Sequence, residues 1–170
     1  MKNAIEIERK FIIKRPSNEL LESLPKTDKS EIFQTYLESD VGQTLRVRKR
    51  VRSGYTEYTE TRKVRIDGMS AYERERTIDE GEYLSLIKNI RHGSRTLVKT
   101  RYAVPCGSYV YEIDIYPEWR NTAIMEVELK TEDAAFDIPS FITVVREVTG
   151  MNEYSNSSMS MRFPDEISLL

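Results

Sequence analysis

The stretch Ile5-Glu6-Ile7-Glu8-Arg9-Lys10-Phe11 lies close to the start of the chain and alternates charged with mostly apolar residues. Successive side chains of an extended strand point to opposite faces, so Glu6, Glu8 and Lys10 share one face and the other four residues share the opposite one. Taken alone, this pattern is typical of a surface strand whose charges lie in water, because charged residues are rarely buried.

The same alternation recurs along the chain, which changes the interpretation. The recurring same-face charged sets are Arg46/Arg48/Arg50, Lys99/Arg101, Glu112/Asp114 and Glu126/Glu128/Lys130. Each set alternates with mostly apolar neighbours, so both signs of charge gather on one sheet surface. That surface is either the outside of the molecule or a polar interior that suits a charged ligand.

Composition also indicates an unusual distribution of charge. The 170 residues fit one domain. Charged residues make up 32% of the chain and apolar residues 39%, against typical values of about 25% and about 45–50%. The net charge of −2 argues against a nucleic-acid partner, which requires a basic excess.

The sequence carries no sign of a membrane or disulfide-bonded protein. Cys106 is the single cysteine, which excludes an intramolecular disulfide and fits a reducing compartment. No run approaches the roughly 20 apolar residues that span a bilayer. We therefore expect a cytoplasmic protein without a membrane partner.

Periodicity and turn signals predict eight strands, at 4–14, 31–38, 45–52, 55–66, 71–78, 95–104, 109–116 and 122–130. Helices are expected at 16–24, 80–90 and 139–149. We expect residues 1–170 to form a single domain, in which 155–170 form a polar cover and a tail.

Eight strands joined by short turns are expected to be antiparallel and to close into a barrel. The fold class predicted is α+β, mainly antiparallel β: a closed eight-stranded tunnel with a charged interior and short helices packed outside. If the charged face points inward, these helices cover the apolar outer face. Unpaired buried ions cost several kcal/mol each, so a mixed-sign interior makes sense for a polyanion with its divalent cation.

Several sequence blocks extend this interpretation to a family. Glu6-Ile-Glu8-Arg-Lys10 resembles the ExExK signature of the CYTH superfamily, also called the triphosphate tunnel metalloenzymes. The supporting blocks, in the family's order, are Tyr36-Leu37, Leu45-Arg46-Val47-Arg48, Thr61-Arg62-Lys63, Glu73-Arg74-Glu75, Lys99-Thr100-Arg101-Tyr102, Tyr111-Glu112-Ile113-Asp114, Glu126-Val127-Glu128-Leu129, Val148-Thr149-Gly150 and Tyr154-Ser-Asn156. The resemblance spans roughly residues 4 to 158.

The resemblance implies a tunnel, open at both ends, that binds a triphosphate with Mg2+ or Mn2+. It implies triphosphate-binding roles for Lys10, Tyr36, Arg46, Arg48, Lys63, Lys99 and Arg101. It implies metal-binding roles for Glu6, Glu8, Asp114, Glu126 and Glu128, and catalytic roles for Glu6, Glu8, Lys10, Glu126 and Glu128. Glu73, Glu75 and Glu112 are expected to support these residues. The chemistry agrees, because Arg and Lys bind phosphate and carboxylates bind Mg2+.

Some assignments depend on the resemblance alone. Periodicity does not choose between Arg62 and Lys63 for the inward position, and the strand at 71–78 is charged on both faces. For Glu73, Glu112 and Lys130, a surface salt-bridge ladder is the competing interpretation. His92 is expected at the surface, and Cys106 receives no role.

The function predicted is a metal-dependent triphosphatase that hydrolyses a phosphoanhydride bond of a small triphosphate, foremost inorganic triphosphate, because few parts of the chain remain to recognise a base or a vitamin. An adenylyl cyclase and a thiamine or nucleoside triphosphatase are alternatives on the same tunnel. A polyphosphate- or nucleotide-binding module is the non-enzymatic alternative, although such a module gains nothing from clustered glutamates. Both a monomer and a homodimer stay open.

Overall fold

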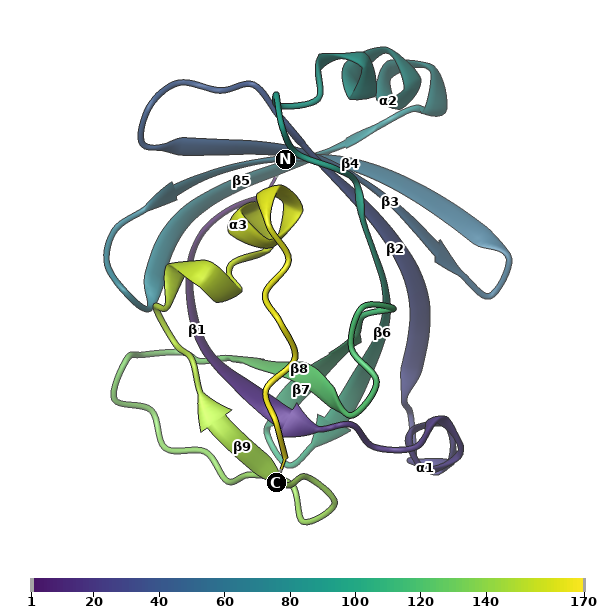
Figure 1. Ribbon diagram of the computed structural model, residues 1–170, viewed down its shortest axis with the longest axis vertical. Coiled ribbons are helices and arrows are strands. Elements are labelled where there is room, and N and C mark those ends of the chain that lie inside the picture. Colours follow the sequence, from purple (N-terminus) through teal and green to yellow (C-terminus); the bar gives the residue numbers. More distant parts are fainter. Residues whose placement is uncertain (1, 170) are drawn as a thin grey trace.

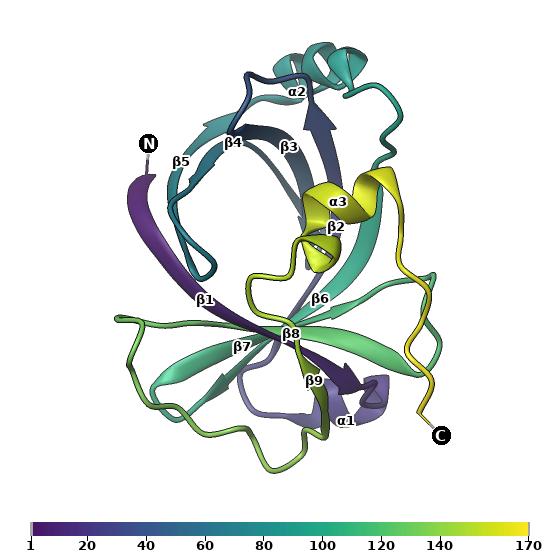
Figure 2. The same ribbon diagram turned by 60° about the vertical axis from the view of Figure 1, so that its left-hand side comes forward.

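The computed structural model describes residues 2–169, with side chains from residue 4 onward, and eight of its strands form a closed antiparallel sheet (Figures 1 and 2). These strands are β1 (Lys2–Lys14), β2 (Asp28–Leu37), β3 (Gln43–Arg52), β4 (Tyr55–Arg65), β5 (Ser70–Ile78), β6 (Leu97–Cys106), β7 (Tyr109–Ile115) and β8 (Thr122–Glu128). Their order is β5-β4-β3-β2-β6-β7-β8-β1, and a β5–β1 pairing closes the sheet. The predicted eight-stranded tunnel is thus confirmed.

The long strand β1 closes the sheet because it pairs with a different neighbour along each half. Residues 2–7 pair with β5, and residues 8–14 pair with β8. In the second half Glu8 lies opposite Glu128, and Lys10 lies opposite Glu126. Closure therefore brings together acidic residues that are more than a hundred positions apart in the sequence.

The helix predicted at 139–149 is wrong. The structure has instead a ninth strand, β9 (Val144–Glu147), which pairs with β1 near Phe11 and Ile12. The run Thr143-Val144-Val145 explains the difference, because β-branched side chains lose rotamer freedom in a helix and pack well on a sheet.

The other two predicted helices are present and cover parts of the apolar outer face. Leu21 of α1 (Asn18–Ser23) joins an apolar cluster that includes Tyr102, Ile113 and Met125. Tyr83 of α2 (Glu80–Leu86), which continues into the 3-10 helix η1 (Ile87–Asn89), packs with Val47 and other residues of the sheet. No helix within residues 2–169 is long and apolar enough to cross a membrane.

The C-terminal segment forms η2 (Asn152–Tyr154) and α3 (Asn156–Met161), and α3 lies in the opening framed by the strands (Figures 1 and 2). The residues after it were expected to be a tail, and in the structure they pack against the rest of the chain. The Phe163 ring centroid lies 5.3 Å from that of Trp119, and the Trp119 Nε1 donates to the Pro164 carbonyl at 3.0 Å.

This packing fills one end of the tunnel. Three apolar residues lie two positions from an inward charged residue on the same strand and therefore also face the interior. They are Ile12 beside Lys10, Leu97 beside Lys99 and Ile124 beside Glu126. They form one apolar cluster with Trp119, Met159 and other residues of the C-terminal part. At this end the interior holds apolar side chains, and the second opening that the resemblance implied is filled.

Candidate functional site

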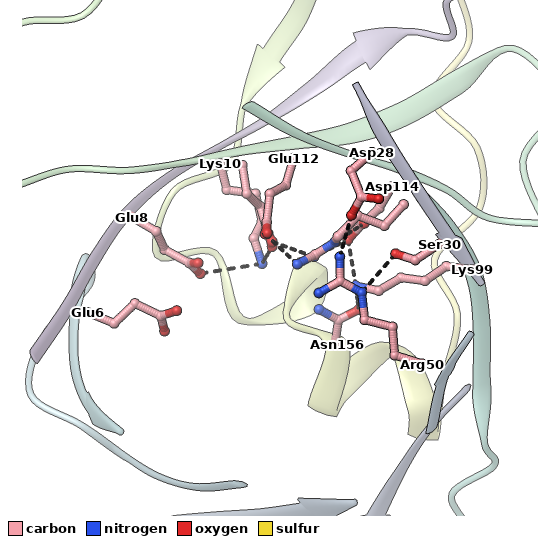
Figure 3. A network of polar contacts seen from close by, with 12 residues as sticks. Glu6, Glu8, Lys10, Asp28, Ser30, Arg50, Lys99, Glu112, Asp114 and Asn156 are labelled. Atoms are coloured by element: carbon pink, nitrogen blue, oxygen red, sulfur yellow. Dashed lines mark hydrogen bonds and ion pairs between the residues drawn. The ribbon is translucent and has the colours of Figure 1, made fainter. Parts of the chain in front are cut away.

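The charged face of the sheet points inward and lines a cavity of about 490 Å³. Every predicted site residue except Asp114 lines it: Glu6, Glu8, Lys10, Tyr36, Arg46, Arg48, Lys63, Glu73, Glu75, Lys99, Arg101, Glu112, Glu126 and Glu128. Figure 3 shows several of them converging from β1, β6 and β7. The alternation left open whether the charged face lies outside or inside, and the structure places it inside, as the resemblance implied.

Two ambiguities of the sequence are resolved by the geometry. The Lys63 Nζ points inward and lies 2.5 Å from a Glu6 carboxylate oxygen, whereas Arg62 is exposed and donates to Gln43. Glu73 lines the cavity, while Arg76 contacts Glu60 and Glu82 outside it.

One part of the wall belongs to a tight cluster of short ion pairs, formed by Lys10, Lys99, Arg101 and Glu126 together with Asp114, which lies behind the cavity lining. The Lys99 Nζ lies 2.5 Å from Asp114 Oδ2, and the Arg101 Nε lies 2.6 Å from Asp114 Oδ1. Glu126 contacts the Lys10 Nζ at 2.8 Å and Arg101 Nη2 at 3.0 Å. Arg101 also pairs with Glu112.

Asp114 was predicted as a metal ligand, but it is fully buried and does not line the cavity. Both of its carboxylate oxygens are taken by cations. We therefore assign Asp114 to holding Lys99 and Arg101 in place. The alternation of β7 gives the inward face but not the depth of a side chain behind it, and a metal-binding role of Asp114 stays a prediction.

The ion pairs of the tight cluster offset the free-energy cost of burying its charged groups. Burial opposes the charged carboxylates of Asp114 and Glu126, but the neighbouring cations hold the pKa of each below its usual range. For Lys99, burial and the like charge of Arg101 outweigh the attraction of Asp114 and lower its pKa to about 8. The cluster is thus internally paired and strongly desolvated.

A second part of the wall is a loose cluster, formed by Arg46, Arg48, Glu73 and Glu75, which Lys63 connects to Glu6 through its 2.5 Å ion pair. Arg46 and Lys63 each lie 3.8 Å from Glu73, and Arg48 lies 3.4 Å from Glu75. Within the described part of the chain, Arg46 Nε, Arg48 Nε and Glu73 Oε2 are buried without a hydrogen-bond partner. Burial and the like charge of Arg46 lower the pKa of Arg48 to about 10.

Unsatisfied buried guanidinium N–H groups cost free energy, and an anionic ligand with several oxygens would satisfy them. Phosphate oxygens match this fork of donors well. The loose cluster is therefore suited to bind a polyanion.

The carboxylates of β1 and β8 suit a divalent cation. Burial and repulsion from Glu126 raise the pKa of Glu8 to about 7, although Lys10 opposes this shift, and Glu128 lies opposite Glu8 in the register. No group of three or more His, Cys, Asp or Glu side chains among residues 4–169 is placed to hold a metal by itself. Mg2+ is commonly held by one or two carboxylates together with waters and substrate phosphates, so these oxygen donors fit that kind of site.

The structure also brings in residues to which the sequence analysis gave no role. Gln34, two positions from Tyr36 on β2, lines the cavity and donates to the Tyr36 hydroxyl at 2.8 Å. Ser155, Asn156 and Ser157 line the cavity from the C-terminal segment. The alternation of β2 could have identified Gln34, and the Tyr154-Ser-Asn156 block was a signal for the cover.

No family model and no curated protein matches the chain. Among solved structures, it is similar to the inorganic triphosphatase NE1496, with 28% identity, coverage of 94% of this chain and 96% of that one, and a TM-score of 0.60. It is similar in fold to the PH1819 protein from Pyrococcus horikoshii OT3, with 21% identity, coverage of 75% and 80%, and a TM-score of 0.56. A putative adenylate cyclase from Vibrio parahaemolyticus has 10% identity, coverage of 75% and 79%, and a TM-score of 0.52.

The closed eight-stranded sheet with a charged interior is the triphosphate tunnel fold of CYTH-type proteins, and these structural similarities agree with that class of fold. Within that class, the chain shares this fold over nearly its whole length with an inorganic triphosphatase.

Proposed function

We propose that this protein is a metal-dependent triphosphatase that hydrolyses inorganic triphosphate. The observation that carries the proposal is the loose cluster, where Arg46 and Arg48 hold buried, unpartnered N–H groups in a cavity that clustered carboxylates also line. A triphosphate would satisfy the arginines, and a divalent cation would neutralise the carboxylates together with the phosphates.

In this proposal Arg46, Arg48 and Lys63 bind the phosphate chain, while Lys10, Lys99 and Arg101 face it from the tight cluster. The bound cation, Mg2+ or Mn2+, would act as a Lewis acid on the phosphate oxygens. Water attacks the terminal phosphorus in line with the bridging oxygen, the bridging P–O bond breaks, and pyrophosphate leaves. The proton of the water passes to a carboxylate among Glu6, Glu8, Glu126 and Glu128.

Inorganic triphosphate is favoured over larger substrates by the lining of the cavity. Among the described residues that line it, Tyr36 is the only aromatic one, so it offers little surface on which a base could stack. The similar structure of an inorganic triphosphatase supports the same substrate.

The test is phosphate release from inorganic triphosphate, ATP and thiamine triphosphate in parallel, with Mg2+, with Mn2+ and with a chelator. We expect release that requires the metal and is fastest from inorganic triphosphate. Formation of cyclic AMP and pyrophosphate from ATP would indicate an adenylyl cyclase. Faster phosphate release from ATP or thiamine triphosphate would identify that compound as the preferred substrate. Tight binding of triphosphate without turnover would indicate a binding module.

A further inference from the structure

We propose that Asn156 is a phosphate-binding residue whose side-chain amide nitrogen donates a hydrogen bond to a non-bridging oxygen of the triphosphate. This inference rests on the proposed function and adds a neutral donor to its basic residues. Asn156 is the first residue of α3, so the C-terminal segment would supply part of the binding site in addition to filling one end of the tunnel.

The orientation of the amide follows from its hydrogen bonds. The Asn156 Oδ1 accepts from the Tyr116 hydroxyl at 2.6 Å and from the Lys99 Nζ at 3.5 Å. The Lys99 ammonium can only donate and the Tyr116 hydroxyl donates here, so the oxygen branch of the amide faces both of them. The NH2 branch is therefore turned away from Tyr116 and Lys99, and the residue lines the large cavity.

The backbone that carries Asn156 is firmly held. Arg91 donates to the Ser157 carbonyl at 2.6 Å and to the Ser160 hydroxyl at 3.0 Å, and Met159 is fully buried in the apolar cluster. Tyr116 is also fully buried. An amide held in this way loses little conformational freedom when it binds a ligand, which favours affinity.

A neutral donor suits this position because cations already crowd it. Asn156 contacts Lys99, and Lys99 already meets the like charge of Arg101. A third positive side chain would add repulsion when the cavity is empty, whereas an amide adds a donor without charge. Figure 3 shows Asn156 beside Lys99, reaching from α3 toward the space that Glu6 and Glu8 approach from β1.

The direct test is an NMR titration of the 15N-labelled protein with inorganic triphosphate, without metal so that no turnover occurs. The Asn156 side-chain amide signal is assigned from its loss in Asn156→Leu. We expect this signal to move on addition of triphosphate, while the side-chain signal of Asn121, an exposed residue outside the cavity, stays in place. If Asn156 only supported Lys99, its side-chain amide would make no direct contact with triphosphate. An Asn156 signal that stays in place while the protein binds triphosphate would overturn the proposal.

Calorimetry on variants gives an independent measurement. Asn156→Leu should weaken the binding of inorganic triphosphate at least about tenfold, as expected for a hydrogen bond to a charged group, and Asn121→Ala should leave binding unchanged. Tyr116→Phe, which frees the amide to turn, should weaken binding by a smaller factor. Parent-like affinity in Asn156→Leu would overturn the proposal, whereas failure of the parent protein to bind triphosphate at all would overturn the proposed function itself.

Discussion

The tight and loose clusters lie in the same cavity wall and contain the same kinds of side chain, yet they are paired very differently. In the tight cluster, Asp114 contacts Lys99 and Arg101 at 2.5 and 2.6 Å, and it is completely buried. In the loose cluster, Arg46 stands 3.8 Å from Glu73 and keeps a buried Nε without a partner. The first region is satisfied by the protein itself, and the second is incomplete.

The difference separates stability from binding. Removing one member of a well-paired buried cluster leaves an uncompensated charge, which is strongly destabilising. Removing a member of an incompletely paired cluster costs the folded protein little, but it removes a donor that a polyanion would use. Mutations in the two clusters should therefore have opposite profiles.

The largest expected effect is on stability in the tight cluster. Asp114→Asn leaves Lys99 and Arg101 buried without a counter-charge, and it should lower the free energy of unfolding by about 3–5 kcal/mol. The matched variant in the loose cluster is Glu73→Gln. Because the Oε2 of Glu73 has no hydrogen-bond partner, this change should lower the free energy of unfolding by under about 1 kcal/mol. Denaturant titrations measure both, and equal losses would contradict the distinction between the clusters.

The next effect is on substrate binding in the loose cluster. Arg48→Ala should raise the KM for inorganic triphosphate roughly 10- to 100-fold, since a hydrogen bond to a charged group contributes about 1.5–3 kcal/mol. Its free energy of unfolding should stay near that of the parent protein. Arg52→Ala is the control, because Arg52 follows on the same strand but lies outside the cavity lining. An unchanged KM in Arg48→Ala would remove this residue from the phosphate site.

A smaller effect concerns pH and the acidic residues that face the loose cluster. The pKa of Glu8 is raised to about 7, so between its unfolded value and about 7 the folded state holds a proton that the unfolded state has lost. Ionising Glu8 therefore destabilises the folded protein as pH rises through this interval. In metal-free buffer, Glu8→Gln should raise the melting temperature at pH 8 by roughly 2–4 °C. This corresponds to a gain of about 1 kcal/mol in the free energy of unfolding, after allowance for partial solvent screening.

The same variant should show much less stabilisation at pH 5, where Glu8 of the parent protein is already largely protonated in the folded state. It should also lose metal-dependent turnover. A stabilisation that is equal at both pH values would mean that the charge of Glu8 is not what burial penalises.

Much of the tunnel could be predicted from the sequence because strand alternation is a local property. The shared face of Glu6 and Glu8 follows from a period of two, and eight antiparallel strands can close into a barrel. The inward direction of that face came from the family resemblance. The choice of Lys63 over Arg62 came from the family resemblance, and the structure agrees with it.

What the sequence could not supply depends on contacts between distant segments. The helix predicted at 139–149 is a strand because β1 leaves an edge beside Ile12 that β9 can pair with. Asp114 follows the same alternation as Glu112, but it is Lys99 and Arg101, on the neighbouring strand, that hold both of its oxygens. The packed C-terminal residues likewise depend on Trp119, more than forty positions earlier.

The smallest expected effect tests whether a short distance by itself makes an ion pair important. The Arg9 Nε lies 2.5 Å from Glu147 Oε1 on the outer face, where β9 meets β1, and the two side chains keep 30% and 40% of their exposure. This pair is as short as the one between Lys99 and Asp114, but water screens it. A double-mutant cycle with Arg9→Gln and Glu147→Gln should give a coupling of about 0.2–1 kcal/mol that falls with added salt.

The corresponding cycle with Lys99→Met and Asp114→Asn should give a coupling several times larger, and salt should change it little, because these two side chains are only 2% and 0% exposed. If the two couplings were equal, distance alone would decide the energy of an ion pair in this protein. The tight cluster would then owe its effect on stability to geometry and not to burial. A clear difference would place the cause in desolvation, which also makes the unpartnered Nε groups of Arg46 and Arg48 in the loose cluster favourable sites for an anion.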